Sequence, residues 1–475
     1  MYPRFVYEGL IWALIGIWLT AAAGAAAHAL INKRDPRAAL GWIVVSLTAP
    51  FFGPLLYFFL GINRIKTKAK ALPGLKSPRA RRQSGAVSSV DLPLEFSELA
   101  GISDAVSSFE LTDGNGVVML HNGEQAYSAM LREIEAAESH VFLSTYIFET
   151  NRSGRAFIDA LKNARDRGVE TRVIVDGVGQ RYSRPRAARL LAREGVEVAK
   201  FLPPRAIPPE VHINLRNHRK ILISDGRVAF TGGMNIGDRH LVDRTDNPDR
   251  VVDAHFRMTG PVVGQLQQVF LENWSFVTGR AAGNFPVDAQ KSGSAKCRTI
   301  VEGPDADLDK LLAVLVGAVS AARRQVAIMT PYFIPPRELV GALQAAALRG
   351  VEVTVILPAK NNLPFVHWAS TNMLWEVLHR GVRVFLQPPP FVHTKLFLVD
   401  GHYVQVGSAN MDSRSLRLNF ELVVEIYDRE FAENVDRHFK AVREQSREVT
   451  LEEVDGRSLP IRIRDGLAWL LSPYL

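Results

Sequence analysis

The sequence predicts an α/β protein made of two similar lobes, each with a mixed, largely parallel sheet flanked by helices, preceded by two transmembrane helices. Three observations predict this fold class: two long apolar stretches near the N-terminus, a strand–helix–strand pattern in the remainder, and the repetition of that pattern in the second half. A chain of 475 residues has room for more than one domain with a substantial core.

Each of the two apolar stretches is expected to form a membrane helix. Gly9–Ile31 is apolar apart from His28, and Ala38–Ile62 contains no charged residue. Both reach the ~20 residues that a spanning helix needs. A cleaved signal peptide would be shorter, and a pair of buried core helices would carry more charge. Pro50 and Pro54 would kink the second stretch, so a re-entrant hairpin is the alternative there.

Basic residues set the predicted orientation of the anchor, which spans residues 1–62. The linker and lead-in, residues 63–110, begin with a flexible basic segment that would attract anionic headgroups. Its basic residues are Arg64, Lys66, Lys68, Lys70, Lys76, Arg79, Arg81 and Arg82, whereas the loop between the apolar stretches carries Lys33, Arg34 and Arg37. The positive-inside rule therefore places the C-terminal part in the cytoplasm, although the basic residues of the loop weaken this prediction.

The composition limits the classes of binding partner and cofactor that we expect. The net charge is +8 and the sequence pI is about 9.5, which favours an anionic lipid surface or a nucleic acid. The single cysteine, Cys297, excludes an intrachain disulfide and fits a reducing compartment. No Cys/His cluster has the spacing of zinc ligands, so no metal is predicted.

The rest of the chain is an internal duplication. A strand, a helix, an Arg-Gly-Val-Glu turn and a second apolar strand occur in residues 140–175 and again in residues 325–357. This is the βαβ pattern of an α/β fold, and two copies indicate two lobes facing each other. The predicted lobes are residues 111–283 and 298–475, separated by a Gly-, Pro- and Ser-containing segment. The apolar end of the second lobe, residues 467–471, either docks on its own domain or lies in the membrane interface.

Both lobes contain the pattern H-x-K-x4-D-x6-G-[GS]-x-N. The first copy consists of His218, Lys220, Asp225, Gly232, Gly233 and Asn235, and the second of His393, Lys395, Asp400, Gly407, Ser408 and Asn410. Apolar runs follow both lysines, so each motif is expected on a strand, with its histidine and lysine on one face. The glycines are expected where the backbone approaches a ligand closely. One copy alone would be moderately specific, and two copies at equivalent positions are strongly specific.

These residue types suit chemistry on a phosphodiester, whose negative charge repels nucleophiles. Lys220, Lys395, Asn235 and Asn410 would neutralise and hold one phosphate without a metal. One histidine would attack phosphorus while the other protonates the leaving oxygen. Asp253 and Glu421, at corresponding positions downstream of the motifs, would orient the histidines. Asp225 and Asp400 belong to the predicted catalytic set, although the glycine after each also fits a turn-forming and buffering role.

The paired motif resembles the signature of the phospholipase D superfamily, and several further stretches resemble the bacterial cardiolipin synthases. Those stretches are residues 214–220, 232–239, 412–421 and 470–475, together with Trp42, Pro50, Gly53, Tyr57 and Gly61 of the apolar segments. The resemblance covers nearly the whole chain. It implies two phospholipase D-like lobes sharing one active site, a phosphohistidine intermediate, His218 as the nucleophile and His393 as the acid and base.

The function implied by the resemblance is phosphatidyl transfer between two phosphatidylglycerol molecules, which gives cardiolipin and glycerol and needs no cofactor. The enzyme would lie in the bacterial inner membrane as a multi-pass protein with cytoplasmic catalytic lobes, without a nucleic-acid partner. The alternative is a phospholipase D-type hydrolase of phospholipid or nucleic-acid phosphodiesters. A non-catalytic lipid-binding scaffold is disfavoured because both motifs are intact.

Overall fold

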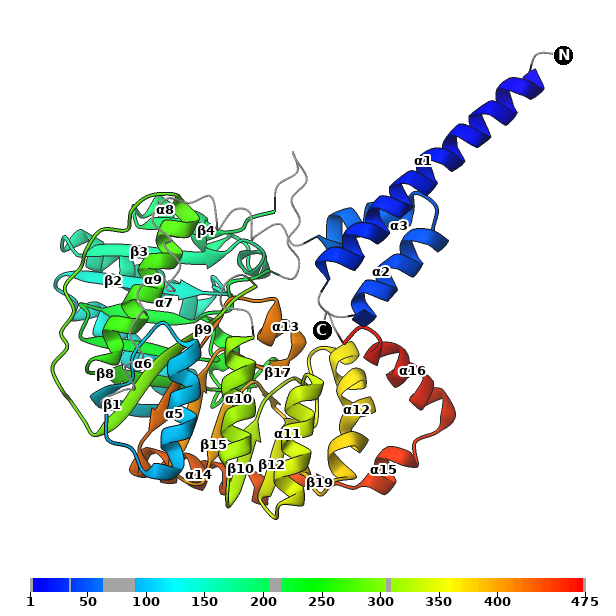
Figure 1. Ribbon diagram of the computed structural model, residues 1–475. Coiled ribbons are helices and arrows are strands. Elements are labelled where there is room, and N and C mark those ends of the chain that lie inside the picture. The colour runs from blue at the N-terminus through cyan, green and yellow to red at the C-terminus, as the bar shows by residue number, and fades with distance from the viewer. Residues whose placement is uncertain (1–2, 34–35, 63–89, 205–214, 305–308, 473–475) are drawn as a thin grey trace. The chain divides into compact units, whose positions relative to one another are not determined.

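The computed structural model describes residues 3–33, 36–62, 90–204, 215–304 and 309–472 (Figure 1). Within these ranges the chain divides into a small helical N-terminal unit and a larger α/β unit. The N-terminal unit comprises α1 (Pro3–Asn32), α2 (Pro36–Thr48), α3 (Phe52–Leu56) and the π-helix η1 (Tyr57–Gly61).

The two apolar stretches of the N-terminal unit differ in structure. Among the described helices, α1 alone is long and apolar enough to cross a membrane, over Tyr7–Asn32. The second stretch is interrupted after α2 at Pro50 and Phe51, whose φ is 60°. A Cβ added to Gly53 would lie 2.1 Å from the carbonyl oxygen of Val45, so α3 turns back against the end of α2. The second stretch is therefore a broken helix, as its prolines predict, and not the continuous transmembrane helix of the predicted fold.

The larger unit contains one 15-stranded sheet in the order β19-β13-β12-β10-β15-β16-β18-β9-β1-β8-β6-β5-β2-β3-β4. The strands of the first half are β1 (Thr112–His121), β2 (His140–Thr145), β3 (Glu170–Asp176), β4 (Glu197–Phe201), β5 (Ile221–Ser224), β6 (Val228–Gly232) and β8 (Ala254–Thr259). Those of the second half are β9 (Ala295–Glu302), β10 (Gln325–Met329), β12 (Glu352–Pro358), β13 (Arg383–Gln387), β15 (Leu396–Val399), β16 (Tyr403–Gly407), β18 (Glu421–Tyr427) and β19 (Arg447–Val449).

The strand order repeats the duplication of the sequence. Reading inward from each side, β4-β3-β2-β5-β6-β8-β1 matches β13-β12-β10-β15-β16-β18-β9, and the two halves join where β1 pairs with β9. The prediction of largely parallel sheets is wrong. Within the described 15-stranded sheet, parallel pairing is confined to β2–β3–β4 and β10–β12–β13, because the motif strands form tight antiparallel hairpins with the strands that follow them.

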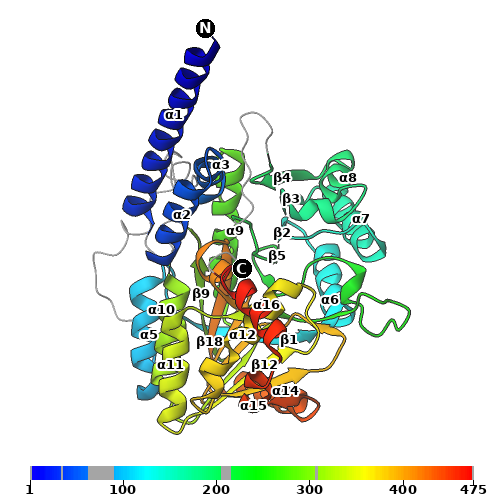
Figure 2. The ribbon, with the colours of Figure 1, turned by 90° about the vertical axis from the view of Figure 1, so that its right-hand side faces the viewer.

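Helices cover the sheet, and each half has its own apolar core. The longer helices are α5 (Leu94–Val106), α6 (Asn122–Glu135), α7 (Arg152–Asp166), α9 (Val262–Thr278), α10 (Lys310–Ala321), α11 (Arg337–Leu348), α12 (Pro364–Leu378), α14 (Arg429–Glu444) and α16 (Leu459–Trp469). The shorter ones are η3 (Gly179–Tyr182), α8 (Ala187–Arg193), η4 (Asp238–His240), α13 (Ser413–Arg417) and α15 (Leu451–Asp455). Figures 1 and 2 show α5 beside α10 and α11. The lead-in helix α5 thus belongs to the core of the second half, where Leu99 packs with Leu311 and Leu315.

Candidate active site

The two motifs are held by main-chain contacts between the halves. The His218 N–H donates to the carbonyl oxygen of Phe420 at 2.9 Å, and the His393 N–H donates to that of Val252 at 2.8 Å. The short strands β7 (Val251–Val252) and β14 (Phe391–Val392) pair in parallel beside the second contact. Each motif histidine is therefore fixed to the segment of the other half that carries a predicted orienting carboxylate.

Each histidine lies beside a buried carboxylate of the opposite half. His218 Nδ1 is 3.1 Å from Glu421 Oε1, and His393 Nδ1 is 2.8 Å from Asp253 Oδ2. Both carboxylates are fully inaccessible to solvent. A carboxylate at Nδ1 favours the tautomer with a proton there, which leaves the Nε2 lone pair for chemistry. The predicted orienting residues thus meet the histidines, but in a crossed arrangement between the halves.

The lysines bring positive charge to both histidines. Lys395 Nζ lies 2.9 Å from Nδ1 and 3.0 Å from Nε2 of His393, and Lys220 Nζ donates to the carbonyl oxygen of His218 at 2.7 Å. Burial lowers the pKa of Lys220 to about 8 and, with the charge of Lys220 contributing, that of Lys395 to about 7. Glu421 and Asp253 oppose the shift of both lysines but do not cancel it, so an anionic ligand beside them would favour their charged forms.

Charged groups from both halves also influence the pKa values of the two histidines. Burial, followed by the charges of Lys395 and Lys220, holds the pKa of His393 well below its ordinary value. Burial also lowers the pKa of His218, while Glu421 opposes that shift and both lysines add to it. The two motifs therefore share one electrostatic environment, as expected for residues that surround a single ligand.

The two carboxylates differ in their own pKa values. Burial alone would raise the pKa of Glu421, but His218, Lys220 and the hydroxyl of Ser408 lower it overall. Burial raises the pKa of Asp253 despite the opposing charge of Lys395. Glu421 is thus the more firmly ionised partner, which distinguishes the two otherwise similar histidine pairs.

The predicted phosphate-binding asparagines are buried next to the motif strands. Asn235 Oδ1 accepts from the N–H of Ile147 at 3.1 Å, and Asn410 Nδ2 donates to Ser415 Oγ at 3.2 Å. The Asn410 Oδ1 is buried without a hydrogen-bond partner among the described residues. The glycine at position 407 serves packing: a Cβ there would lie 2.2 Å from the carbonyl oxygen of Leu422 on β18. This close approach is to a neighbouring strand and not to a ligand.

Asp225 and Asp400, which the sequence predicted to belong to the catalytic set, have the contacts of the turn-forming alternative. Each lies in the turn after its motif strand with a φ of 53° or 52° and accepts backbone N–H groups from the residues that lead into β2 or β10. Burial would raise the pKa of Asp225, but these N–H groups and Arg227 outweigh it and lower the pKa. Both aspartates therefore fix a hairpin to the adjacent strand through backbone N–H groups, and within the described residues their hydrogen bonds do not involve a motif histidine.

Three further residues belong to the surroundings of the histidines. The Tyr146 ring is 5.0 Å from that of His218, and the Tyr332 ring is 6.3 Å from that of His393. The two tyrosines occupy matching positions after β2 and β10. Asp176, at the end of β3, accepts from the Asn217 N–H at 3.1 Å and pairs with Arg216 at 2.8 Å, which fixes the chain before His218. No sequence motif singled out Asp176.

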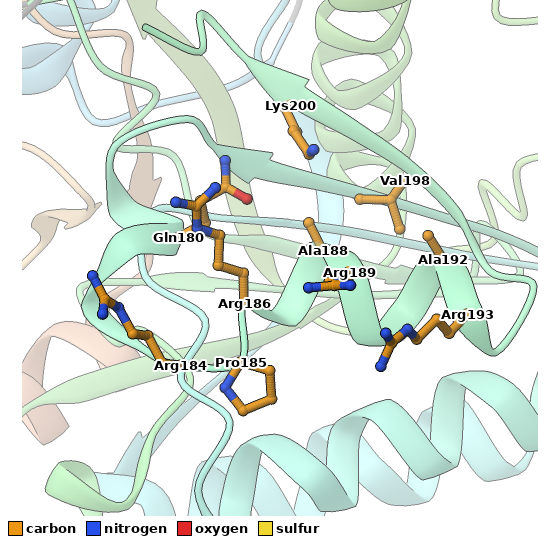
Figure 3. A pocket seen from close by; sticks show the side chains of 10 residues that line it. All are labelled: Gln180, Arg184, Pro185, Arg186, Ala188, Arg189, Ala192, Arg193, Val198 and Lys200. Carbon is orange, nitrogen blue, oxygen red and sulfur yellow. The ribbon is translucent and has the colours of Figure 1, made fainter.

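A separate basic hollow of about 880 Å³ lies at the edge of the first half (Figure 3). Its cationic side chains are Arg184, Arg186, Arg189, Arg193 and Lys200, all exposed. Arg189 and Arg193 share a face of α8, and Lys200 extends from β4 beside them (Figure 3). No carboxylate is among the residues that line this hollow. In the described part of the chain, no group of three His, Cys, Asp or Glu side chains has a metal-binding arrangement.

A duplicated α/β fold whose paired His-Lys motifs share crossed carboxylates defines a phospholipase D-like enzyme of phosphodiester chemistry. The family model described as "Cardiolipin synthase, PLD-like domain" matches residues 130–274 and 315–443, and "Phospholipase_D-nuclease N-terminal" matches residues 10–61. The chain belongs to the cardiolipin synthase family of the phospholipase D superfamily, and it is a phosphatidyltransferase.

Similar proteins support this membership. A cardiolipin synthase of Oceanobacillus iheyensis and a major cardiolipin synthase of Bacillus subtilis are each 31% identical to this chain, over 94% of it and 95% of their own length. The crystal structure of phosphatidylserine synthase from Haemophilus influenzae superposes with a TM-score of 0.63 at 13% identity, covering 80% of this chain and 100% of that one. The likeness to the two cardiolipin synthases confirms the family that the motifs predicted. The likeness to the phosphatidylserine synthase structure concerns the fold alone.

Proposed function

We propose that this enzyme joins two phosphatidylglycerol molecules into cardiolipin and glycerol through a phosphohistidine at His218. The observation that carries the proposal is the crossed arrangement of the two histidines, each beside a buried carboxylate of the other half and both within the field of the two lysines. Membership of the cardiolipin synthase family supports the choice of substrate.

In the first step, Nε2 of His218 attacks the phosphorus of one phosphatidylglycerol, and the bond from phosphorus to the glycerol headgroup oxygen breaks. His393 gives a proton to that oxygen, and glycerol leaves. Attachment of phosphorus at Nε2 leaves a proton on Nδ1 and a positive ring, which the ionised Glu421 at 3.1 Å stabilises. The firmer ionisation of Glu421 relative to Asp253 supports His218 as the nucleophile.

In the second step, His393 removes the proton from a headgroup hydroxyl of a second phosphatidylglycerol. That oxygen attacks phosphorus, the phosphorus–nitrogen bond breaks, and cardiolipin forms. His393 is neutral in the free enzyme because burial and the lysines lower its pKa. A bound phosphodiester anion between Lys220 and Lys395 offsets that lysine charge, and so raises the pKa of His393 toward the value that an acid needs.

The lysines and asparagines hold the phosphate in this proposal. Two buried ammonium groups supply the positive charge that a phosphodiester anion needs during attack. Asn235 and Asn410 lie beside the lysine-bearing strands and would contribute amide donors. The paired carboxylates orient the rings and do not touch the phosphate.

We also infer where the enzyme lies. Both apolar segments of the N-terminal unit enter the bacterial inner membrane, α1 as a span and the broken second segment beside it, with the catalytic unit on the cytoplasmic side. The apolar length of α1, the match of residues 10–61 to an N-terminal family model and the excess of Lys and Arg after the second segment support this arrangement. The basic hollow on α8 and β4 supports an anionic lipid surface as the partner.

Product analysis tests the proposal against the hydrolase alternative. The purified full chain, reconstituted in vesicles of labelled phosphatidylglycerol, should form cardiolipin and release one glycerol for each cardiolipin, with little phosphatidic acid. Added glycerol should convert cardiolipin back to phosphatidylglycerol, because one phosphodiester replaces another. Phosphatidic acid as the chief product, with no effect of glycerol, would identify a phospholipase.

A further inference from the structure

The C-terminal helix α16 docks on the protein through a buried ion-pair cluster and through Ala468 and Trp469, which pack with the apolar core of the second half. Asp465 is fully buried and forms ion pairs with Arg457 and, at 2.7 Å, with Arg464. The Arg464 guanidinium also lies 4.6 Å from the Trp368 ring of α12. Figure 2 shows α16 lying along α12. Of the two predicted positions for this tail, contact with its own domain is therefore present, through a face that combines the Asp465 ion pairs with Ala468 and Trp469.

The opposite face of α16 is apolar and open to solvent. Leu459, Ile463 and Leu467 recur every four residues on one stripe, and their exposed fractions are 68%, 54% and 61%. Leu470 extends the stripe and is equally exposed. A surface helix of a water-soluble protein has the reverse arrangement, with its apolar stripe toward the core. The outer stripe of α16 is thus suited to apolar surroundings.

Helix α12, which packs against α16, also exposes apolar side chains. Its inner side packs in the core through Val366, Met373 and Val377, while Phe365 and Trp375 are exposed on its outer side. We call the exposed set Phe365, Trp375, Leu459, Ile463, Leu467 and Leu470 the α12–α16 face. Exposed apolar side chains gathered on two packed helices are typical of a site of interaction with protein or membrane.

The start of the α12–α16 face is tied to the catalytic centre. The Tyr332 hydroxyl donates to Asn362 Oδ1 at 2.9 Å, and Asn361 Nδ2 donates to the carbonyl oxygen of Pro331 at 2.9 Å. Tyr332 is also the ring beside His393. The loop that leads into α12 and to Phe365 is therefore pinned to the wall of the active site.

We propose that the α12–α16 face inserts into the acyl region of the lipid monolayer, as a second membrane contact independent of the N-terminal anchor. This proposal deepens the proposed function and rests on it in one respect, since it takes a bilayer lipid as the substrate. A lipid whose phosphodiester occupies the site beside Tyr332 would then have its acyl chains at the apolar level of the inserted face. Insertion removes the exposed leucines and isoleucine from water without requiring a protein partner.

Charge favours a lipid surface over a second copy of the chain as the occupant. Arg462 is exposed on α16 beside the stripe, and Arg464 flanks the stripe on its other side. Basic residues beside an apolar stripe reach the phosphate level while their aliphatic stems remain in the apolar layer. A twofold pairing of the same face would instead place the arginines of both copies around one interface, which is unfavourable for like charges.

A single-cysteine fluorescence experiment tests insertion. The one native cysteine, Cys297, is fully buried, so a thiol-reactive environment-sensitive dye will label an introduced surface cysteine selectively. The full-length chain carries Leu467→Cys in one sample and, as a matched control, Leu348→Cys in another; Leu348 is 68% exposed at the end of α11, outside the face. Both also carry His218→Asn, so that the readout does not depend on turnover. They are reconstituted in phosphatidylglycerol-containing vesicles with quenchers attached to the acyl chains or with aqueous iodide.

We expect the acyl-chain quencher to quench the dye at position 467. Iodide should quench this dye roughly tenfold less than it quenches the dye at position 348, since burial of a leucine-sized group favours lipid by about that factor or more. Quenching of both dyes by iodide alone would overturn the proposal. Protection of position 467 that depends on protein concentration, without acyl-chain quenching, would also overturn it and identify self-association. Failure of product formation in the unlabelled enzyme would instead concern the proposed function.

A functional arm uses the double substitution Ile463→Glu and Leu467→Glu, with Leu348→Glu as the control and thermal unfolding as the test of folding. In vesicles, the double variant should lose roughly tenfold or more of its cardiolipin formation because two carboxylates oppose insertion. With a short-chain phosphatidylglycerol dissolved as monomers, its rate should match that of the control. A folded double variant that is unaffected in vesicles would refute the role of the face.

Discussion

Replacement of Glu421 by glutamine isolates the carboxylate that the structure places beside the proposed nucleophile. Glu421 Oε1 is 3.1 Å from His218 Nδ1, and its other oxygen accepts from Ser408 Oγ at 2.5 Å. Glutamine keeps the size of the side chain but removes the negative charge that stabilises the positively charged phosphohistidine. Hydrogen bonds to charged groups contribute about 1.5–3 kcal/mol, so kcat should fall about ten- to hundredfold.

The same substitution predicts a shift in pH dependence. His218 must be neutral to attack, so activity falls as pH decreases through its pKa in the enzyme. Burial already lowers that pKa, and Glu421 opposes the shift. Removal of the carboxylate should therefore lower the His218 pKa further and move the acidic limb of kcat/KM to lower pH. The assay is cardiolipin formation by the reconstituted full chain over a range of pH.

Glu425→Gln provides a matched control on the same strand. Glu425 is also fully buried, but it pairs with Arg298 at 2.5 Å and contacts no motif histidine in the described structure. This variant should have a lower unfolding temperature while the folded enzyme keeps its pH profile. An unchanged kcat in Glu421→Gln, or an acidic limb that moves to higher pH, would refute the reasoning.

Three further predictions concern other parts of the unit. Asp225→Asn and Asp400→Asn should each destabilise the fold by about 1–3 kcal/mol, because these side chains accept hydrogen bonds from backbone N–H groups beside a turn. The unfolding temperature should fall while kcat of the folded enzyme stays near wild type. A large loss of kcat without destabilisation would instead indicate a catalytic role. The basic limb of kcat/KM should lie near pH 7–8, since Lys395 and Lys220 lose their charge above pKa values of about 7 and 8 in the free enzyme. The basic limb of kcat should lie at higher pH because bound phosphate favours the charged lysines. Basic limbs of kcat and kcat/KM at the same pH would contradict this prediction. Arg189→Gln combined with Arg193→Gln should weaken the dependence of the rate on anionic lipid in mixed vesicles. Arg337→Gln combined with Arg380→Gln should not, because these arginines are exposed but lie outside the basic hollow. Equal effects of the two pairs would mean that the hollow acts only through general surface charge.

The sequence predicted the duplication and the residues around the histidines because both depend on local, repeated patterns. The order β4-β3-β2-β5-β6-β8-β1 and its counterpart reproduce the repeat, and Asp253 and Glu421 do lie beside histidines. The crossing of those partners was not predictable. Each carboxylate follows the motif of its own half in the chain, and only the pairing of β7 with β14 and the contact of Asn217 with Phe420 bring it to the other half.

Other differences have equally specific causes. The sheet is mainly antiparallel because the Asp225-Gly226 and Asp400-Gly401 turns make hairpins of strands that apolar runs alone could not orient. The buried ion pairs under α16 escaped prediction because burial of Asp465 depends on Arg457 and Arg464, a tertiary arrangement that periodicity does not reveal. The lengths of the two apolar stretches predicted two transmembrane helices, whereas the second stretch is interrupted at Pro50.

Location of the covalent intermediate tests the central claim most directly. The reconstituted full-length enzyme is mixed with phosphatidylglycerol labelled in its phosphate, quenched within one turnover under mildly alkaline conditions, digested and examined by mass spectrometry. The crossed arrangement predicts a phosphatidyl group on His218, lost in His218→Asn, formed more slowly in His393→Asn and little changed in Glu425→Gln. Label on His393 alone would reverse the two roles, and cardiolipin formation without label on either histidine would contradict the phosphohistidine mechanism.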